Sequence, residues 1–312
     1  MNQDRKGEFR FRSHSSFMGT GADLFAVIGF QRTGTNILRE ILTTHEQIAV
    51  IGEVLLPSPD PTFALGSPLV GEVYPLDNFY RELPPGGLRS MSPREAELLL
   101  DRYFAYVHDK IRYHSIKGAK GRCRFIGVNI KYNQLRESTP ANWDPAAPPF
   151  LLGYFNSRGT TLIHSIRTNV IHCALSVIIS AQRNLWNNYE DAAIDCSYRI
   201  DIDECLAYAR MFVHDHDSFL KFAKDITLVE CCYENLCEDI ARAGADGEIP
   251  DSPGPLRDIA EVLGVPFRFH YDGRLRKAIN VPYSRLVSNW DDLLLALEQS
   301  EFSAFATTLA DC

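Results

Sequence analysis

The chain has 312 residues, of which 45% are hydrophobic and 23% charged, an ordinary composition for one large or two small globular domains. The formal net charge of −8 argues against a general binder of nucleic acid or acidic membranes, because neither attracts an acidic surface. No apolar run approaches the roughly 20 residues of a membrane span, and the polar N-terminus has no signal-peptide core, so we expect a cytoplasmic protein.

Predicted strands and helices alternate along most of the chain. Residues 1–22 are polar and rich in Gly and Ser, which predicts a flexible arm before one domain over 23–312. Short apolar runs predict strands at 24–29, 48–51, 124–132, 160–166 and 226–230. Periodicity and capping signals predict helices at about 35–45, from 92 onward, and at 170–184, 202–223, 234–242 and 256–263. This order predicts a single P-loop-like α/β domain with a central, mainly parallel sheet flanked by helices.

Two further patterns concern local structure. Leu56–Gly87 is rich in Pro and Gly, which predicts a long irregular loop that serves as a lid or is disordered. Ser92-Pro93-Arg94-Glu95 then combines an N-cap, Pro at the first helical position and a capping-box Glu. The eight cysteines show no C-x-x-C pair and no metal-ligand spacing, so we expect buried free thiols and no bound metal.

The stretch FAVIGFQRTGTNILREIL, residues 25–42, predicts a strand, a loop and a helix in succession. This is the plan of a phosphate-binding loop, in which backbone N–H groups and a helix N-terminus point at one anion. Gly29 and Gly34 keep the glycine spacing of the motif G-x-x-x-x-G-K-[ST], but Thr35 and Asn36 replace its Lys and Ser/Thr. The cation is instead Arg32, inside the loop, so the loop suits an anion but is wrong for ATP hydrolysis.

A second candidate anion site follows the predicted strand 160–166. Arg167 lies at the end of that strand, and Ser176 follows nine residues later in the next predicted helix. Ligands in open α/β sheets bind outside the carboxyl ends of the strands, which favours a phosphate site; a structural ion pair of Arg167 is the alternative. Together the two sites predict a ligand with two separated phosphate-type groups.

These segments resemble the sulfotransferases that use 3′-phosphoadenosine 5′-phosphosulfate (PAPS). IGFQRTGTN is similar to their 5′-phosphosulfate loop and IRTNVIHCALS to their 3′-phosphate segment. ITLVECCYENLCED, LRDIAEVLGVPF, RLRKAIN and SNWDDL resemble later family segments in the same order. Within the family, roughly residues 24–305 most resemble the bacterial carbohydrate sulfotransferases of the Nod-factor type.

The resemblance implies direct in-line transfer of a sulfuryl group from PAPS to a hydroxyl or amine of an acceptor, leaving 3′-phosphoadenosine 5′-phosphate. It assigns the 5′-phosphosulfate to Arg32, Thr33, Gly34, Thr35 and Asn36. It assigns the 3′-phosphate to Arg167 and Ser176, with Arg276 and Lys277 closing over it, and an adenine contact to Tyr233.

The reaction also needs a base for the acceptor proton. Glu53 follows the second predicted strand and matches the family's Glu, so we choose it; His45 is the second candidate, although it also suits a cap at a helix C-terminus. Lys131 would stabilise the leaving group or the sulfuryl oxygens, together with Arg32. Asn129 stands where the family has Lys, with Lys131 two residues later on the same strand face.

Two other functions stay open on the sequence: a P-loop kinase or NTPase, and a catalytically inactive PAPS-binding protein. The acceptor is expected to be a carbohydrate or small molecule that contacts the loops 54–90 and 133–150, because specificity lies in loops. The sequence indicates neither the oligomeric state nor whether oxygen or nitrogen is sulfated.

Overall fold

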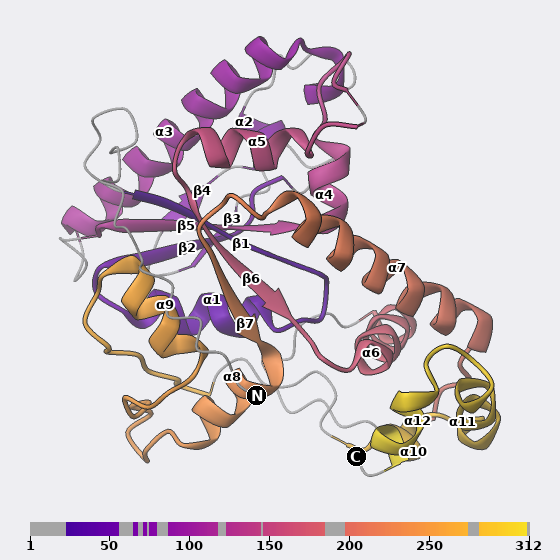
Figure 1. Ribbon diagram of the computed structural model, residues 1–312. Helices are drawn as coiled ribbons and strands as arrows, with labels where there is room; N and C mark the ends of the chain where they lie inside the picture. The colour runs from indigo at the N-terminus through magenta and orange to yellow at the C-terminus, as the bar shows by residue number, and fades with distance from the viewer. Residues whose placement is uncertain are drawn as a thin grey trace, which may run out of the picture.

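The computed structural model describes residues 23–55, 65–67, 71–73, 75–79, 87–117, 123–144, 146–184, 197–273 and 281–310. A five-stranded sheet with the order β2-β5-β1-β6-β7 lies at its centre (Figure 1). Its strands are β1 (Asp23–Gly29), β2 (Ile48–Glu53), β5 (Phe125–Lys131), β6 (Thr161–Ile166) and β7 (Leu228–Cys232). Each neighbouring pair is parallel, which confirms the predicted α/β class.

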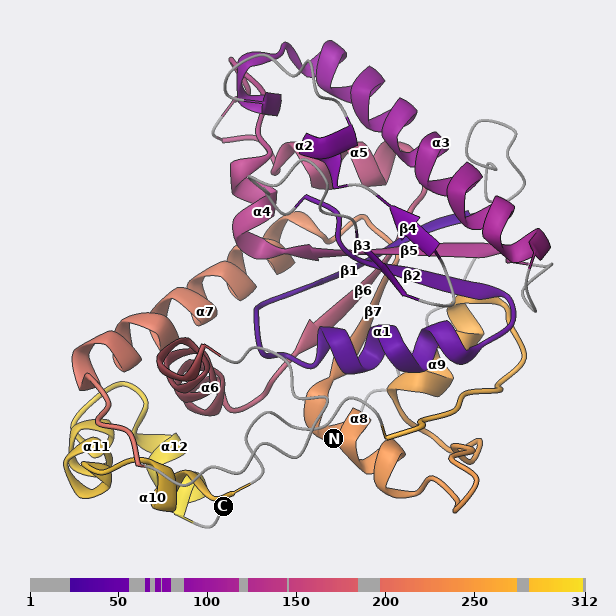
Figure 2. The same ribbon diagram turned by 180° about the vertical axis from the view of Figure 1, so that it is seen from behind.

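Helices cover both faces of the sheet. One face carries α3 (Pro93–Lys117) and α5 (Phe150–Ser157), and the opposite face carries α1 (Thr35–Thr44), α8 (Tyr233–Ala241) and α9 (Pro255–Leu263) (Figures 1 and 2). The other helices are α2 (Leu76–Phe79), α4 (Tyr132–Glu137), α6 (Val170–Arg183), α7 (Ile202–Phe222), α10 (Tyr283–Leu286), α11 (Trp290–Glu298) and α12 (Ser303–Ala310). Over the described ranges, none has both the length and the apolar character needed to cross a membrane.

The strands are continuously apolar because both faces of the sheet are covered. In β1, Ala26 and Ile28 join the core formed with α3 and α5, whereas Phe25 and Val27 join the core formed with α1 and α9. All four side chains are fully buried. Successive side chains of a strand point to opposite faces, so a strand between two helical layers needs apolar residues at every position.

A third apolar core attaches the C-terminal helices to α6 and α7. It contains Tyr283 and Leu286 of α10 together with Leu293 of α11. Beside it, the buried amide of Asn289 both donates to the Ile200 carbonyl and accepts from the Ile200 N–H, at 2.9 Å each. This packing holds α10 next to α6, so it decides which C-terminal residues reach the functional site.

The stretch expected to be irregular contains short elements. β3 (Leu65–Ser67) and β4 (Gly71–Val73) form an antiparallel pair, and a 3-10 helix, η2 (Gly87–Ser90), precedes α3. This stretch is rich in Pro and Gly, which indicate loops, so the short elements were not predicted from the sequence. The predicted N-terminal arm, residues 1–22, lies outside the described residues.

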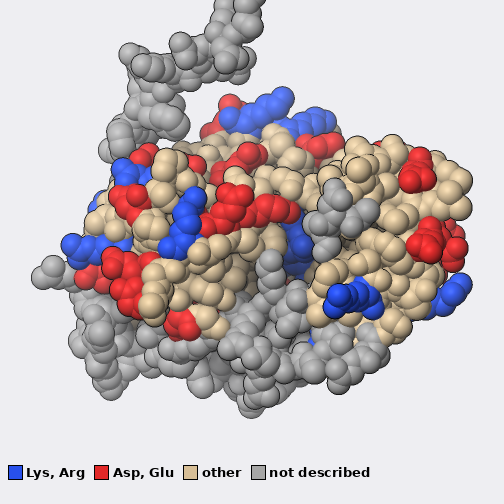
Figure 3. Space-filling view, turned by 90° about the horizontal axis from the view of Figure 1, so that it is seen from below, with Lys and Arg blue, Asp and Glu red and all other residues tan. Residues whose placement is uncertain are grey.

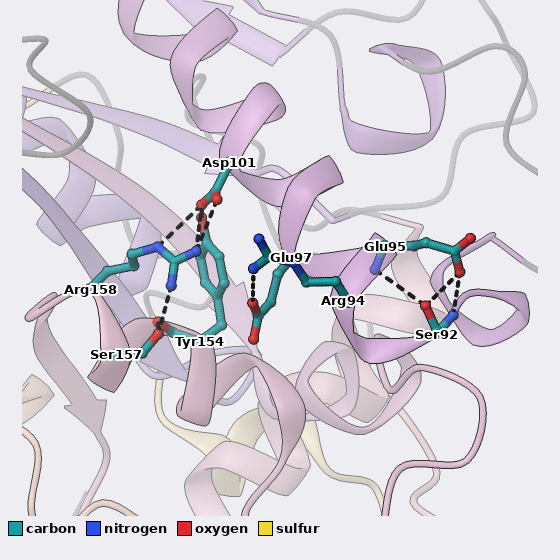
Figure 4. Close-up of polar contacts among 8 residues, drawn as sticks. All are labelled: Ser92, Arg94, Glu95, Glu97, Asp101, Tyr154, Ser157 and Arg158. Carbon is teal, nitrogen blue, oxygen red and sulfur yellow. Dashed lines mark hydrogen bonds and ion pairs between the residues drawn. The ribbon is translucent and has the colours of Figure 1, made fainter.

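The start of α3 confirms the predicted capping box. The Ser92 N–H donates to Glu95 Oε2 at 2.8 Å, and the Glu95 N–H donates to Ser92 Oγ at 3.4 Å (Figure 4). Farther along α3, Asp101 accepts two hydrogen bonds from Arg158 Nη2 and one from the Tyr154 hydroxyl, all at 2.9 Å. Arg158 follows α5 and Tyr154 lies within it, so these bonds fix α5 against α3 (Figure 4).

Candidate functional site

Residues far apart in the sequence meet at the carboxyl ends of the parallel strands. The loop after β1, Glu53 at the end of β2, Lys131 at the end of β5 and Arg167 directly after β6 all lie along this edge. Seen from below, basic side chains are visible inside a hollow of the surface, with acidic side chains along one side of it (Figure 3). This edge is where ligands bind in open α/β sheets.

The loop after β1 has a tight conformation that leads into α1. Gly34 is the N-cap of α1 with φ 83°, and a Cβ there would lie 2.4 Å from the ring of Tyr233, so only glycine fits. Arg32 also has a positive φ, 67°. The Thr33 hydroxyl donates to a carbonyl inside the loop at 2.9 Å, and the Thr33 carbonyl accepts from Ser165 Oγ at 2.7 Å. The Thr33 hydroxyl, which we expected to face the ligand, therefore holds the loop together.

Lys131 brings a cation to this loop from the neighbouring strand. Its Nζ donates to Thr35 Oγ1 at 2.5 Å and lies 3.8 Å from Glu53 Oε1, and its side chain is only 4% exposed. Burial, opposed by the charge of Glu53, lowers the pKa of Lys131 to about 8. Because Thr35 Oγ1 accepts this bond, its own proton can point to an anion. The loop thus has a lysine after all, although β5 supplies it.

A bulge at the end of β2 brings Glu53 opposite β5. The strand register shifts between Ile51 and Glu53, so that Glu53 pairs with Asn129. The Glu53 side chain is 26% exposed, so solvent or an acceptor can reach it. Asn129 is fully buried, and neither polar atom of its amide has a hydrogen-bond partner among the described residues. An unpaired buried amide is costly, so this one is available to a water or a ligand.

The side chain of Arg32 reaches across to α6. Its Nε donates to Ser176 Oγ at 2.9 Å, although we expected these two residues to serve separate phosphate groups. The two candidate anion sites therefore adjoin. Burial lowers the pKa of Arg32, and the charge of Arg167 acts in the same direction. A bound anion would relieve both effects.

Arg167 lies between Tyr233 and Glu234. Its guanidinium carbon is 5.0 Å from the centroid of the Tyr233 ring, and its Nε is 3.9 Å from Glu234 Oε1. That separation allows an ion pair but no hydrogen bond, and Nε has no hydrogen-bond partner within the described part of the chain. The ion pair expected as the alternative is therefore present, but it leaves a buried donor free for an anion. The predicted contact of Tyr233 with adenine stays a prediction.

The second anion site consists mainly of side chains and less of the backbone N–H groups at the N-terminus of α6. Asn169 caps α6, because its side-chain oxygen accepts from the His172 N–H at 3.0 Å. The His172 N–H is therefore already occupied. Farther into α6, the buried Ser176 lies close to Tyr283 of α10, whose pKa burial raises and the Ser176 hydroxyl lowers. The Tyr283 hydroxyl also donates to the His172 carbonyl at 3.1 Å. Tyr283 was not among the predicted site residues, because it is uncharged and belongs to no pattern that indicates a phosphate site.

His45 does not join these residues. His45 is buried at the other end of α1, where Nδ1 accepts from the Gln47 N–H at 3.1 Å and Nε2 donates to the Pro266 carbonyl at 2.9 Å. It is the C-cap of this ten-residue helix, about 15 Å from the loop. This position suits the capping role and not proton transfer at the loop. Arg276 and Lys277 lie in 274–280, outside the described residues.

The described residues fit a ligand with two phosphate groups. The N-terminus of α1 with Lys131 forms one cationic centre, and Arg32 with Arg167 forms the next. The unpaired Arg167 Nε is the observation that most clearly indicates an anion. Over the ranges the structure describes, no group of three or more His, Cys, Asp or Glu residues could hold a metal ion.

No protein-family model matches this chain, and no curated protein matches it. Among solved structures, the chain is similar to the crystal structure of a sulfotransferase from Alicyclobacillus acidocaldarius, with 12% identity and a TM-score of 0.41 over 92% of this chain and 96% of that one. It is also similar to the sulfotransferase domain of the olefin synthase from Synechococcus PCC 7002, with 14% identity and a TM-score of 0.39 over 93% and 94%. Likenesses this low assign no activity and no residue roles.

Proposed function

We propose that this protein transfers a sulfuryl group from PAPS to a hydroxyl or amine of a carbohydrate or small-molecule acceptor. The observation that carries the proposal is the hydrogen bond between Arg32 and Ser176, because it joins a phosphate loop to a second cationic site at Arg167. A nucleotide with phosphate groups at both its 3′ and 5′ positions can occupy both sites at once. The sequence motifs that resemble the PAPS-dependent sulfotransferases support the same donor.

When bound, PAPS would supply the sulfuryl group and a phosphate leaving group. The loop N–H groups, Thr35 Oγ1 and Lys131 Nζ would hold the 5′ side. Arg167 Nε and Ser176 Oγ would hold the 3′-phosphate. Donors held rigidly in a buried site stabilise developing charge without reorganising, and the burial of Lys131 and Arg167 provides this condition.

We assign Glu53 as the base. Its carboxylate is partly exposed and lies beside Lys131 Nζ, so an acceptor above the loop can reach both groups. The acceptor's O–H or N–H proton would pass to a Glu53 carboxylate oxygen as the new bond to sulfur forms. The bond between sulfur and the bridging oxygen breaks at the same time, and its electron pair stays with the departing phosphate.

The test is transfer of labelled sulfate from PAPS to a mixed library of carbohydrates and small molecules, read by mass spectrometry. The wild type should label at least one acceptor, and Glu53→Gln should lower turnover by at least about 100-fold with little change in PAPS affinity. Glu46→Gln is the matched control, since Glu46 is exposed just before β2, at the strand end far from the site. Unchanged turnover in Glu53→Gln would remove Glu53 from this role. Labelling of no acceptor by the wild type would count against the transferase itself.

A further inference from the structure

Tyr283 lies between the second anion site and α6. Arg32 Nε donates to Ser176 Oγ at 2.9 Å, and the Tyr283 hydroxyl donates to the His172 carbonyl at 3.1 Å. Burial raises the pKa of Tyr283 and the neighbouring Ser176 hydroxyl lowers it, which places the two hydroxyls close together. Each hydroxyl has one proton. Because Tyr283 uses its proton in the bond to His172, only Ser176 can be the donor toward Tyr283.

The carbonyl that Tyr283 occupies is the one that Ser176 would otherwise use. Ser176 lies four residues after His172 in α6, and a serine inside a helix commonly donates back to the carbonyl four residues earlier. A hydroxyl turned that way no longer offers its proton to a ligand beside the helix. Tyr283 competes for the His172 carbonyl and offers Ser176 a different acceptor. It thereby keeps the Ser176 hydroxyl facing Arg32 and the second anion site.

We propose that Tyr283 is a positioning residue for 3′-phosphate recognition: it orients the Ser176 hydroxyl, and through Ser176 it ties the loop residue Arg32 to the second anion site. This inference rests on the proposed use of PAPS. A phosphate oxygen is a stronger acceptor than a phenol oxygen, so the Ser176 hydroxyl would donate its hydrogen bond to an arriving 3′-phosphate instead of to Tyr283. Its oxygen would keep accepting from Arg32, so the tie to the loop is maintained in the bound state.

The surrounding packing makes this arrangement rigid. The rings of Tyr283 and His172 are stacked, with centroids 5.1 Å apart and an interplanar angle of 24°. Tyr283 also belongs to the apolar core that holds α10 against α6. The hydroxyl can therefore be removed without displacing the ring. A change from Tyr to Phe isolates the proposed hydrogen bonds from the packing.

The test compares the binding of adenosine 3′,5′-bisphosphate and adenosine 5′-monophosphate by calorimetry. Tyr283→Phe and Ser176→Ala should each weaken binding of the bisphosphate by about tenfold, the order expected for a lost hydrogen bond to a charged group. Each should change binding of the monophosphate less than twofold. The double variant should bind the bisphosphate as Ser176→Ala does, because Tyr283 acts only through Ser176. Tyr208→Phe, in α7 of the same apolar core, is the control and should match the wild type.

Two kinds of outcome overturn the inference and can be told apart. If the losses of Tyr283→Phe and Ser176→Ala add in the double variant, or if both nucleotides weaken equally, Tyr283 has a general structural role. The proposed function would survive that result. If the wild type binds no adenosine 3′,5′-bisphosphate, the proposed function fails and the inference fails with it. Thermal unfolding of each variant identifies any loss that comes from misfolding.

Discussion

At the level of single residues, Lys131 is where the stability of the fold and the proposed function most clearly oppose each other. Its ammonium group is almost fully buried between Thr35 and Glu53, and its pKa falls from the ordinary 10.5 to about 8. Burial is the main cause, and the charge of Glu53 offsets only part of it. A charged lysine in this place destabilises the fold, which is the pattern expected of a group retained for its function.

Lys131→Met should stabilise the protein at pH 7 by up to about 3 kcal/mol, which is the free-energy equivalent of the lowered pKa. Below pH 8 both the folded and unfolded states carry the Lys131 proton, so the folded wild type bears the full cost. Between pH 8 and 10.5 the unfolded state holds more protons, so wild-type stability rises with pH and the advantage of the variant shrinks.

Urea unfolding of both proteins from pH 7 to 10.5 measures this difference, and other titrating groups cancel in the comparison. Lys221→Met, at an exposed position in the last turn of α7, should show no such pH-dependent difference. A Lys131→Met difference that stays constant with pH would mean that the lysine is not strained in the fold.

The sequence predicted most residues of the candidate site but not the partners that their side chains have in the structure. Arg32 was expected to face the loop's own anion, yet its Nε donates to Ser176 across the sheet edge. Lys131 could be placed on the correct strand face by alternation, but its bond to Thr35 depends on how β5 aligns with β1. Tyr283 could not be found, since the packing of α10 against α6 is a tertiary contact that no local pattern encodes.

At the level of elements, the five parallel strands were predicted from the sequence. The predicted strand ends are wrong at positions where contacts with neighbouring elements determine the end. The strand expected at 226–230 is β7, Leu228–Cys232, because the Ile226 N–H bonds to the Ala223 carbonyl in the turn after α7. The strand expected to reach residue 132 ends at Lys131. Lys131 is the N-cap of α4, and its backbone N–H donates to Gln134 Oε1 at 2.8 Å. Lysine is an unusual N-cap, so no capping signal predicted that a helix starts here.

The cap of α3 was predicted from four residues and can be tested alone. Ser92→Ala should lower the free energy of unfolding by about 1 kcal/mol, because it removes the hydroxyl that bonds to the Glu95 N–H and carboxylate. Ser92→Asp keeps a capping oxygen and should lose much less, although it places a second carboxylate near Glu95. Urea unfolding gives both values. Equal stability of wild type and Ser92→Ala would show that the box adds nothing to α3.

Across the whole molecule, one sheet edge concentrates positive charge in an otherwise acidic chain. The formal net charge is −8, yet Arg32, Lys131 and Arg167 meet where β1, β5 and β6 end, on the central strands of the sheet. The topology does this because β1 lies between β5 and β6. The burial that lowers the pKa values of Arg32 and Lys131 also makes an anionic ligand stabilising for the whole fold.

Ligand-induced stabilisation should therefore separate the two anion sites. Adenosine 3′,5′-bisphosphate at 100 times its dissociation constant should add about 2.7 kcal/mol to the unfolding free energy and raise Tm by about 4 °C. At the same concentrations, Arg167→Ala should lose most of this shift but keep most of the shift produced by adenosine 5′-phosphosulfate, which needs only the loop. Equal losses for the two nucleotides would refute the 3′-phosphate role of Arg167. A larger shift with ATP and magnesium than with the bisphosphate would instead favour a kinase or NTPase, because only such an enzyme has a use for a third phosphate in this loop.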